Sequence, residues 1–250
     1  MRTPIIAGNW KMNKTPYEGR VLTSHIAEHE LDEAVEAVLC VPFTDLQAVG
    51  EAFGNADLHL GAQNMYFEEK GAYTGEISAK MLKDLGVEYV ILGHSERRDI
   101  FGESDELIRK KVAKALEEGL RPILCVGESL EERESGKAQE IVGNQLLRDF
   151  EGLGGTDFEN IVIAYEPKWA IGTGKTASAE DAEEMCAFIR RQIGSTFGKK
   201  ASDDVRIQYG GSVKPENVKE IMSKENIDGA LVGGASLEAH SFLALVNYRN

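Results

Sequence analysis

Short hydrophobic runs recur along the whole chain, and each is followed by a polar or glycine-containing break and then by a stretch with helical spacing. The runs are rich in Val, Ile and Leu, a composition that favours buried β-strands. They cover residues 4–8, 37–41, 58–62, 89–93, 122–126, 161–165, 205–209 and 229–232. The pattern therefore predicts eight strands that alternate with helices.

The clearest helices are predicted at residues 104–118, 129–150 and 178–197, and each of them opens at a serine. A serine hydroxyl in that position can accept a hydrogen bond from a backbone N–H that the first helical turn leaves free. Ser129 and Glu132 also have the spacing of a capping box, which strengthens the predicted start of the second helix.

The length of the chain selects between two arrangements of these elements. Its 250 residues give about 30 residues per strand, the size of one β-α-β step, and successive steps build a parallel sheet with right-handed crossovers. An open, doubly wound sheet is the alternative, but nucleotide-binding sheets of that kind normally have a glycine-rich first turn. The first turn here is Asn9-Trp10-Lys11. We therefore predict an α/β fold, a single-domain (β/α)8 barrel over residues 1–250.

The charge of the chain argues against two classes of partner, and its cysteine content argues against two classes of fold. The formal net charge of −14 repels phosphate backbones and anionic lipid headgroups, so we expect neither nucleic acid nor a membrane surface as a partner. Cys40, Cys125 and Cys186 are widely spaced, and no C-x-x-C occurs. A disulfide framework and a zinc finger are thus not expected.

The hydropathy pattern offers no membrane segment. The apolar run near the N-terminus is too short for a signal-peptide core, and no window approaches the roughly 18 apolar residues of a bilayer span. We expect a protein of the reducing cytoplasm.

Polar residues and glycines follow several of the predicted strands directly. In a barrel of this kind the chemistry gathers at the C-terminal ends of the strands, so these residues would share one rim. They are Asn9, Lys11, His94, Ser95, Glu96, Glu166, Gly210, Gly211, Ser212, Gly233 and Gly234.

Three of these side chains suit proton transfer on an anionic substrate. Glu166 lies just beyond an apolar strand, where a general base is the sharper interpretation and a solvated loop acid the alternative. His94 is either an acid or electrophile, or a hydrogen-bonded core histidine. Lys11 is either a solvated lysine or a cation that offsets developing negative charge. Glu96 is expected to form an ion pair with Lys11 or Arg97.

The glycine pairs after the last two strands indicate a phosphate site. A backbone without Cβ lets N–H groups converge on an anion, and a helix N-terminus adds partial positive charge. Barrels frequently hold phosphate at the loops after the last two strands. The alternative is that each pair only makes a tight turn.

The segment after Glu166 has the composition of a hinged lid, because it starts at a proline and has two glycines near its end. The predicted lid comprises Pro167, Lys168, Trp169, Ala170, Ile171, Gly172, Thr173, Gly174 and Lys175. A phosphate-binding P-loop is excluded, since its first glycine would have to stand at Trp169.

Several longer motifs resemble one family. These are residues 7–13 (AGNWKMN), 61–64 (GAQN), 71–76 (GAYTGE), 93–98 (GHSERR), 125–128 (CVGE), 164–175 (AYEPKWAIGTGK), 209–212 (YGGS) and 229–235 (GALVGGA). Their order and spacing resemble the triosephosphate isomerase family from end to end of the chain. The resemblance implies a TIM barrel.

The resemblance also implies an activity. That family interconverts dihydroxyacetone phosphate and D-glyceraldehyde 3-phosphate, a step of glycolysis and gluconeogenesis, through an enediolate and without a metal or organic cofactor. By resemblance, Glu166 is the base, His94 a neutral electrophile and Lys11 the cation that offsets negative charge. Asn9 would polarise a substrate oxygen, and the phosphate would be bound by backbone N–H groups of Gly172, Ser212, Gly233 and Gly234. Ser95 and Glu96 would support the site.

The family is itself a known example of a loop that closes over its substrate. One departure is Lys168, where the family usually has an aliphatic residue, and we expect Lys168→Val to change product release more than chemistry. The resemblance further implies a homodimer in which the loop 63–76 docks beside the neighbouring active site, with Thr74 near the neighbour's Lys11 and His94. The alternative is that the apolar side chains of this loop pack on their own barrel.

Two other functions fit a barrel of this kind. A Schiff-base aldolase would carry a lysine inside a strand, and none of the eight predicted runs contains one. A catalytically silent scaffold would be expected to have lost Glu166, His94 or Lys11, and all three are present.

Overall fold

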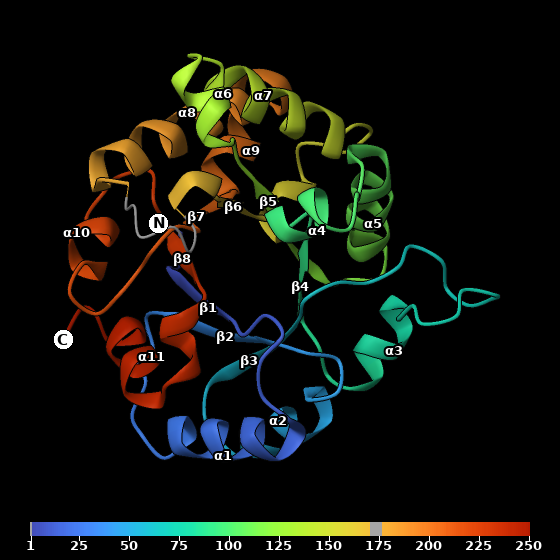
Figure 1. Ribbon diagram of the computed structural model, residues 1–250, viewed down its shortest axis with the longest axis vertical. Helices are drawn as coiled ribbons and strands as arrows, with labels where there is room; N and C mark the ends of the chain where they lie inside the picture. The colour runs from blue at the N-terminus through green and yellow to red at the C-terminus, as the bar shows by residue number, and fades with distance from the viewer. Residues whose placement is uncertain (1, 171–176) are drawn as a thin grey trace.

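A computed structural model describes residues 2–170 and 177–250 of the chain (Figure 1). Its sheet is a closed parallel barrel in which every strand pairs with its neighbours in sequence and β1 pairs with β8. The strands are β1 (Ile5–Asn9), β2 (Glu36–Val41), β3 (Leu58–Ala62), β4 (Tyr89–Leu92), β5 (Arg121–Val126), β6 (Val162–Tyr165), β7 (Arg206–Tyr209) and β8 (Gly229–Val232). The predicted eight-stranded barrel is confirmed.

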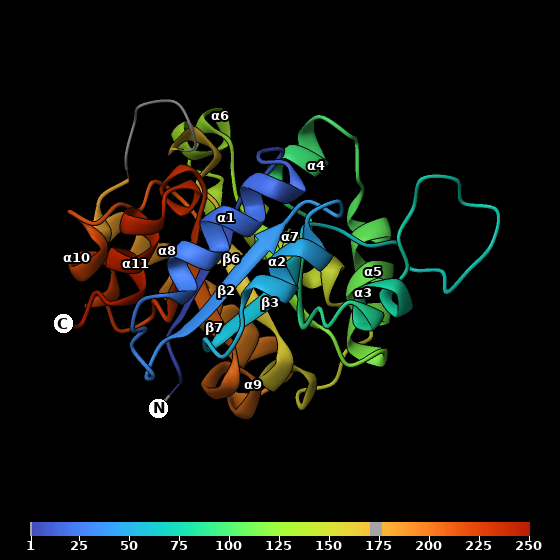
Figure 2. The ribbon, with the colours of Figure 1, turned by 90° about the horizontal axis from the view of Figure 1, so that it is seen from below.

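Helices surround the barrel and cover its outer face (Figures 1 and 2). The α-helices are α1 (Pro16–Ala27), α2 (Leu46–Ala52), α3 (Ala79–Asp84), α4 (Ser95–Asp99), α5 (Asp105–Glu117), α6 (Leu130–Glu134), α7 (Ala138–Asp149), α8 (Ala179–Phe197), α9 (Lys199–Asp204), α10 (Val218–Met222) and α11 (Ala239–Val246). Short 3-10 helices are η1 (Asp157–Asn160), η2 (Lys168–Ala170) and η3 (Gly234–Leu237).

The strands are hydrophobic on both faces because both faces are buried. Alternate residues such as Ile5, Ala7 and Val38 fill the barrel interior, while Ile6 and Ala37 belong to the larger cluster between the strands and the surrounding helices. This arrangement explains why the strands appear in the sequence as continuous apolar runs without hydrophobic–polar alternation.

Two of the three predicted helices are confirmed and one is wrong. Ser104 and Ser178 cap α5 and α8 through their side chains, as expected. The helix predicted at 129–150 is instead two helices, α6 and α7, although Ser129 and Glu132 do form the capping box. Gly136 lies between them at φ +76, a left-handed conformation that ends a helix and that glycine adopts without a Cβ clash.

Candidate active site

A cavity of about 770 Å³ opens at the C-terminal ends of the strands. The barrel brings together there seven of the residues singled out in the sequence as catalytic or phosphate-binding. They are Asn9, Lys11, His94, Glu166, Ser212, Gly233 and Gly234. Ser95 and Glu96 stand beside them as the first two residues of α4.

Glu166 follows β6 and is buried, with an exposed fraction of 2%. Both of its carboxylate oxygens are engaged: Oε2 accepts a hydrogen bond from the Ser95 N–H (2.9 Å), and Oε1 lies 2.8 Å from Nε2 of His94. Burial acts to raise the pKa of Glu166, but the His94 ring and the Ser95 N–H lower it below its ordinary value. The carboxylate is therefore held ionised, as a base must be.

His94 is held by the first turn of α4. It occupies the N-cap position, and its Nδ1 accepts a hydrogen bond from the Glu96 N–H (3.2 Å). A ring nitrogen that accepts a hydrogen bond does not carry a proton, so in the neutral ring the proton is on Nε2, which points at Glu166. Burial acts to lower the pKa of His94, yet the neighbouring Glu166 carboxylate raises it. Moving Glu166 away removes that effect and favours the neutral ring.

Lys11 has an unusual backbone. Its φ of +52 lies in the left-handed region, which is sparsely populated by residues other than glycine. Two side chains hold this conformation: Asn9 Oδ1 accepts from the Lys11 N–H (3.0 Å), and Gln63 Nε2 donates to the Lys11 carbonyl (2.9 Å). Nζ of Lys11 lies 2.6 Å from Oε1 of Glu96, so Lys11 is the ion-pair partner of that glutamate.

The two glycine pairs of the rim differ in what surrounds them. A Cβ on Gly210 would lie 2.9 Å from Cγ of Glu166, and a Cβ on Gly211 would lie 2.1 Å from the Tyr209 hydroxyl oxygen. Packing therefore requires glycine at both of these positions. Gly233 and Gly234 have no such neighbour, since a Cβ there meets only Cε of Lys11 at 3.8 Å or nothing within 4 Å. Their missing Cβ atoms leave space in the cavity itself, which is what an anion bound by backbone N–H groups needs.

The beginning of the predicted lid lies beside α4 and the end of β5. Trp169 donates from Nε1 to Oε1 of Glu128 (2.9 Å), and Nζ of Lys168 pairs with Oδ1 of Asp99 (2.8 Å). Pro167 and Ala170 also belong to the described chain, and Ala170 lines the cavity. The remaining predicted lid residues, Ile171, Gly172, Thr173, Gly174 and Lys175, lie outside the described residues.

Four residues that support the site were not predicted from the sequence to do so. Gln63 holds the Lys11 backbone, Glu128 binds Trp169, and Asp99 pairs with Lys168. A Cβ on Gly127 would lie 1.8 Å from the Glu166 carbonyl oxygen, so glycine at this position allows the two chain segments to approach each other at Glu166. Gly127 follows β5 as Glu166 follows the adjacent β6, so its strand-end position was a usable signal. Asp99 had no such signal.

The described residues also bear on other functions. Within residues 2–170 and 177–250, no group of three His, Cys, Asp or Glu side chains could hold a metal ion. In the same ranges no helix is long and apolar enough to cross a membrane. The eight strands of the described barrel also contain no lysine, the residue that a Schiff-base aldolase would require there.

Comparison with known proteins gives one consistent result. The family model described as triosephosphate isomerase matches residues 4–249. The chain is 57% identical over 249 residues to a protein named triosephosphate isomerase from Finegoldia magna, covering 99% of each chain. Proteins of the same name from Alkaliphilus oremlandii and Alkaliphilus metalliredigens are 57% and 56% identical, and each comparison covers 99% of this chain and 100% of the relative. The chain therefore belongs to the triosephosphate isomerase family.

Proposed function

We propose that the cavity interconverts dihydroxyacetone phosphate and D-glyceraldehyde 3-phosphate, with Glu166 and His94 as the groups that move protons. The main support for this function is the buried pair, in which Glu166 Oε1 lies 2.8 Å from His94 Nε2. Lys11 lines the same cavity. The names of the relatives specify the same reaction.

The chemistry follows from the protonation states of the pair. Glu166 takes a proton from the carbon beside the substrate carbonyl, and the released electron pair forms a carbon–carbon double bond while the carbonyl oxygen becomes negative. The Nε2–H of His94 stabilises that oxygen and passes a proton between the two substrate oxygens. Glu166 then returns its proton to the neighbouring carbon, which produces the isomeric carbonyl compound. No external oxidant, reductant or metal is needed for this balance.

Binding of the substrate is assigned to the cation and to the glycine turns. Lys11 offsets the negative charge of the phosphate and of the enediolate, and Asn9 polarises an oxygen beside it. The phosphate is assigned to backbone N–H groups of Ser212, Gly233 and Gly234, and by family resemblance to that of Gly172. An enediolate phosphate readily eliminates phosphate in water, so a segment that covers the intermediate, the predicted lid, has a chemical purpose.

A single substitution tests the assignment. Isomerisation of glyceraldehyde 3-phosphate is followed through an enzyme that reduces dihydroxyacetone phosphate, with no metal added. Glu166→Gln should lower kcat by roughly 10²–10⁴-fold, because a glutamine cannot accept the carbon-bound proton. The matched control is Glu36→Gln at the opposite end of the barrel, which should leave kcat unchanged. A folded wild-type protein without activity, or a fully active Glu166→Gln, would contradict the proposal.

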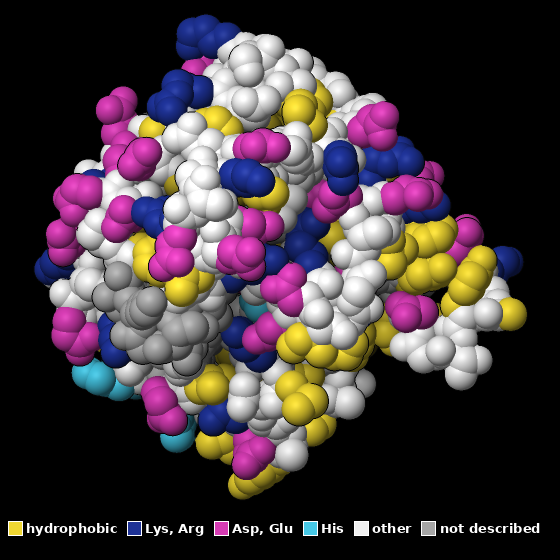
Figure 3. All heavy atoms as spheres, turned by 45° about the horizontal axis from the view of Figure 1, so that its top comes forward, with side chains coloured by type: hydrophobic (Ala, Val, Ile, Leu, Met, Phe, Trp, Pro, Cys, Tyr) yellow, Lys and Arg dark blue, Asp and Glu magenta, His cyan; other side chains and the backbone are white. Residues whose placement is uncertain are grey.

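We also propose that the active form is a homodimer joined through the loop 63–76, which projects from the body of the barrel (Figures 1 and 2). Hydrophobic side chains are exposed on this loop (Figure 3), and Tyr73 has an exposed fraction of 40%. Three hydrophobic side chains outside this loop are exposed as well: Met12, Ile100 and Phe101 have exposed fractions of 97%, 72% and 66%. Met65, in contrast, is buried on its own barrel, so only part of the loop is left to contact a second chain. Thr74 is then expected near the partner's Lys11 and His94.

The mass of the particle in solution tests the dimer. Sedimentation equilibrium should give twice the chain mass for the wild type and a single chain mass for Thr74→Arg, with activity lost in parallel. Glu51→Gln, an exposed change on α2, is the control that should remain dimeric. A monomeric and fully active wild type would exclude this assembly.

We further infer a cytoplasmic location. Cys40, Cys125 and Cys186 are all buried and unpaired, which is usual for proteins of a reducing compartment.

A further inference from the structure

The segment that carries the base contacts α4 at both ends of that short helix. Glu166 Oε2 accepts a hydrogen bond from the N–H of Ser95, the first residue of α4. Two residues further along, Nζ of Lys168 lies 2.8 Å from Oδ1 of Asp99, the last residue of α4. The base and the neighbouring lysine are therefore fixed to the same helix, and His94 is its N-cap.

This arrangement differs from the one that the reaction requires. Both Glu166 oxygens are occupied by Ser95 and His94, and Nε2 of His94 is occupied by Glu166. A substrate carbon can reach the carboxylate only after the carboxylate exchanges these partners for the substrate. Whatever stabilises the segment on α4 in the resting state therefore opposes productive binding.

We propose that Lys168 and Asp99 are a positioning pair that restrains the Glu166 segment on α4 and so sets the free-energy cost of moving the base onto the substrate. The inference rests on the proposed role of Glu166. It assigns a partner and an effect to Lys168, and an aliphatic side chain at this position could not pair with Asp99.

The expected size of the effect follows from exposure. The side chains of Lys168 and Asp99 are 20% and 54% exposed, so water and salt screen the pair. The Lys168 backbone N–H also donates to the Glu128 carbonyl (3.1 Å), and this contact does not depend on the side chain. Substituting the side chain should therefore leave the fold intact and shift a binding equilibrium by about two- to fivefold, the range for an exposed ion pair.

Affinity for 2-phosphoglycolate tests the pair, because the carboxylate of this two-carbon phosphate resembles the enediolate. The measurement compares the wild type, Lys168→Met, Asp99→Asn and the double variant by titration calorimetry. The pair predicts tighter binding in both single variants, with no further gain in the double variant. If only the charge of Lys168 mattered, Lys168→Met would bind 2-phosphoglycolate more weakly, since losing a cation weakens the binding of an anion. The sign of that one change therefore separates the two explanations.

Two controls complete the test. Lys114 pairs with Glu118 at 2.7 Å and is 17% exposed, so Lys114→Met removes a similar pair on α5 and should leave the affinity unchanged. The gain in Lys168→Met should disappear at high ionic strength, where the wild-type pair is already screened. Weaker or unchanged binding in Lys168→Met would overturn the inference. The proposed function would then still stand if Glu166→Gln abolishes turnover, and it would fail separately if Glu166→Gln does not.

Discussion

The two ends of the barrel each have a hollow of nearly the same size, about 770 Å³ at the C-terminal ends of the strands and about 760 Å³ at the N-terminal ends. Each hollow contains a carboxylate that is largely withdrawn from water: Glu166 at one end and Glu36 at the other. Neither the volume of the hollow nor the presence of a buried carboxylate therefore distinguishes the candidate active site from the opposite end of the barrel.

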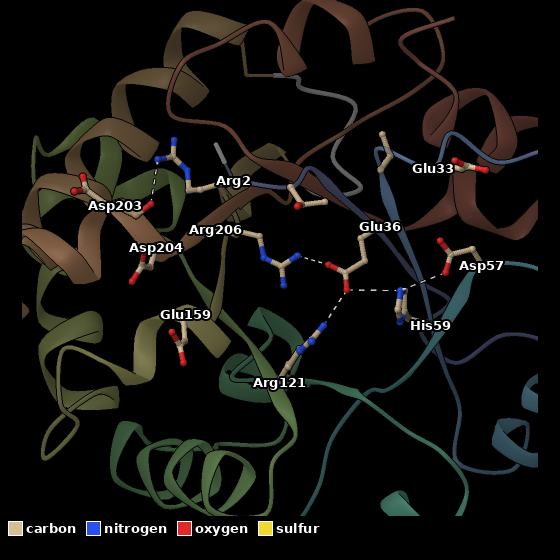
Figure 4. Close-up of a pocket in the computed structure, with 12 residues that line it drawn as sticks. Arg2, Glu33, Glu36, Asp57, His59, Arg121, Glu159, Asp203, Asp204 and Arg206 are labelled. Atoms are coloured by element: carbon tan, nitrogen blue, oxygen red, sulfur yellow. Dashed lines mark hydrogen bonds and ion pairs between the residues drawn. The ribbon is translucent and has the colours of Figure 1, made fainter.

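The difference lies in how each carboxylate is held. Glu36 is bound by side chains that are also bound to one another. Arg121 donates to its Oε1 (3.0 Å) and Arg206 donates to its Oε2 (Figure 4). Tyr89 donates to the same Oε1 (2.5 Å). Arg121 and Arg206 both also donate to the Tyr89 hydroxyl (2.9 Å and 3.0 Å). Moving Glu36 would leave two arginines without their shared counter-charge.

Among the described residues, Glu166 is held chiefly by the Ser95 N–H and by Nε2 of His94, and in the proposed reaction the substrate replaces both. Glycine at residue 210 also leaves room beside the carboxylate, because a Cβ there would lie 2.9 Å from Cγ of Glu166. Exchangeable partners suit the catalytic role proposed for Glu166, whereas the closed network around Glu36 suits a structural role.

A methyl group beside Glu166 tests whether freedom of movement distinguishes this carboxylate from Glu36. In Gly210→Ala the new Cβ would lie 2.9 Å from Cγ of Glu166 and 3.1 Å from the Tyr165 carbonyl oxygen, so the base must shift. We expect kcat to fall by about 10–100-fold with KM little changed, because a displacement of about 1 Å at a reacting group costs that order of rate.

The matched change at the other glycine pair is Gly234→Ala. A Cβ there meets nothing within 4 Å, so the base is not displaced, and the loss should appear in KM through the proposed phosphate contacts. Steady-state kinetics of both variants give the two parameters separately. An unchanged kcat in Gly210→Ala would show that the close approach to Glu166 has no functional consequence.

The prediction of the fold from the sequence succeeded because both faces of every strand are buried. The predicted and observed strand bounds differ by at most one residue at either end, and residues 58–62 and 229–232 agree fully. The helix predicted at 129–150 was wrong for a local reason. The apolar spacing continues on both sides of Gly136, whereas the left-handed backbone at that residue has no periodic signal.

The site was predictable where a strand ends and unpredictable where a contact crosses between loops. Asn9 ends β1, while Lys11, His94 and Glu166 follow strands, and a closed barrel places all four on one rim. The pairing of Lys168 with Asp99 joins residues 69 positions apart on two connecting segments, and no periodicity or spacing specifies it.

Substitution of Glu36, at the N-terminal ends of the strands, is expected to lower the stability of the fold without changing kcat. Glu36→Gln leaves Arg121 and Arg206 without their counter-charge while Glu166 and its partners are untouched. The Glu36 side chain is 13% exposed, so we expect a loss of about 2–3 kcal/mol, somewhat below the 3–5 kcal/mol of a fully buried pair. This corresponds to a fall in Tm of about 4–12 °C for a chain of this length.

Calorimetry or circular dichroism measures that Tm, and kcat at room temperature serves as the internal comparison. Glu51→Gln on α2 changes an exposed glutamate in the same chemical way and should leave Tm nearly unchanged. Equal thermal stability of Glu36→Gln and the wild type would mean that the network at the N-terminal ends is not structural, and the distinction between the two carboxylates would be lost.

The smallest expected effect is the pH dependence of that same stability. Burial acts to raise the pKa of Glu36, but Arg206 and the Tyr89 hydroxyl lower it below the ordinary value of 4.5. A carboxyl whose pKa is lower in the folded state binds protons more weakly there than in the unfolded chain. Its stabilising contribution is therefore complete above pH 4.5 and is lost as the pH falls through the folded-state pKa.

Urea unfolding at a series of acidic pH values tests this sign. The free energy of unfolding of the wild type should fall below pH 4.5, and Glu36→Gln should show a shallower fall because it has no proton to take up at this position. Other carboxylates with lowered pKa values, Glu166 among them, still titrate in the variant, so a residual slope is expected. Parallel curves for the two proteins would show that Glu36 does not contribute to the acid sensitivity, which would then belong to the other carboxylates with lowered pKa values.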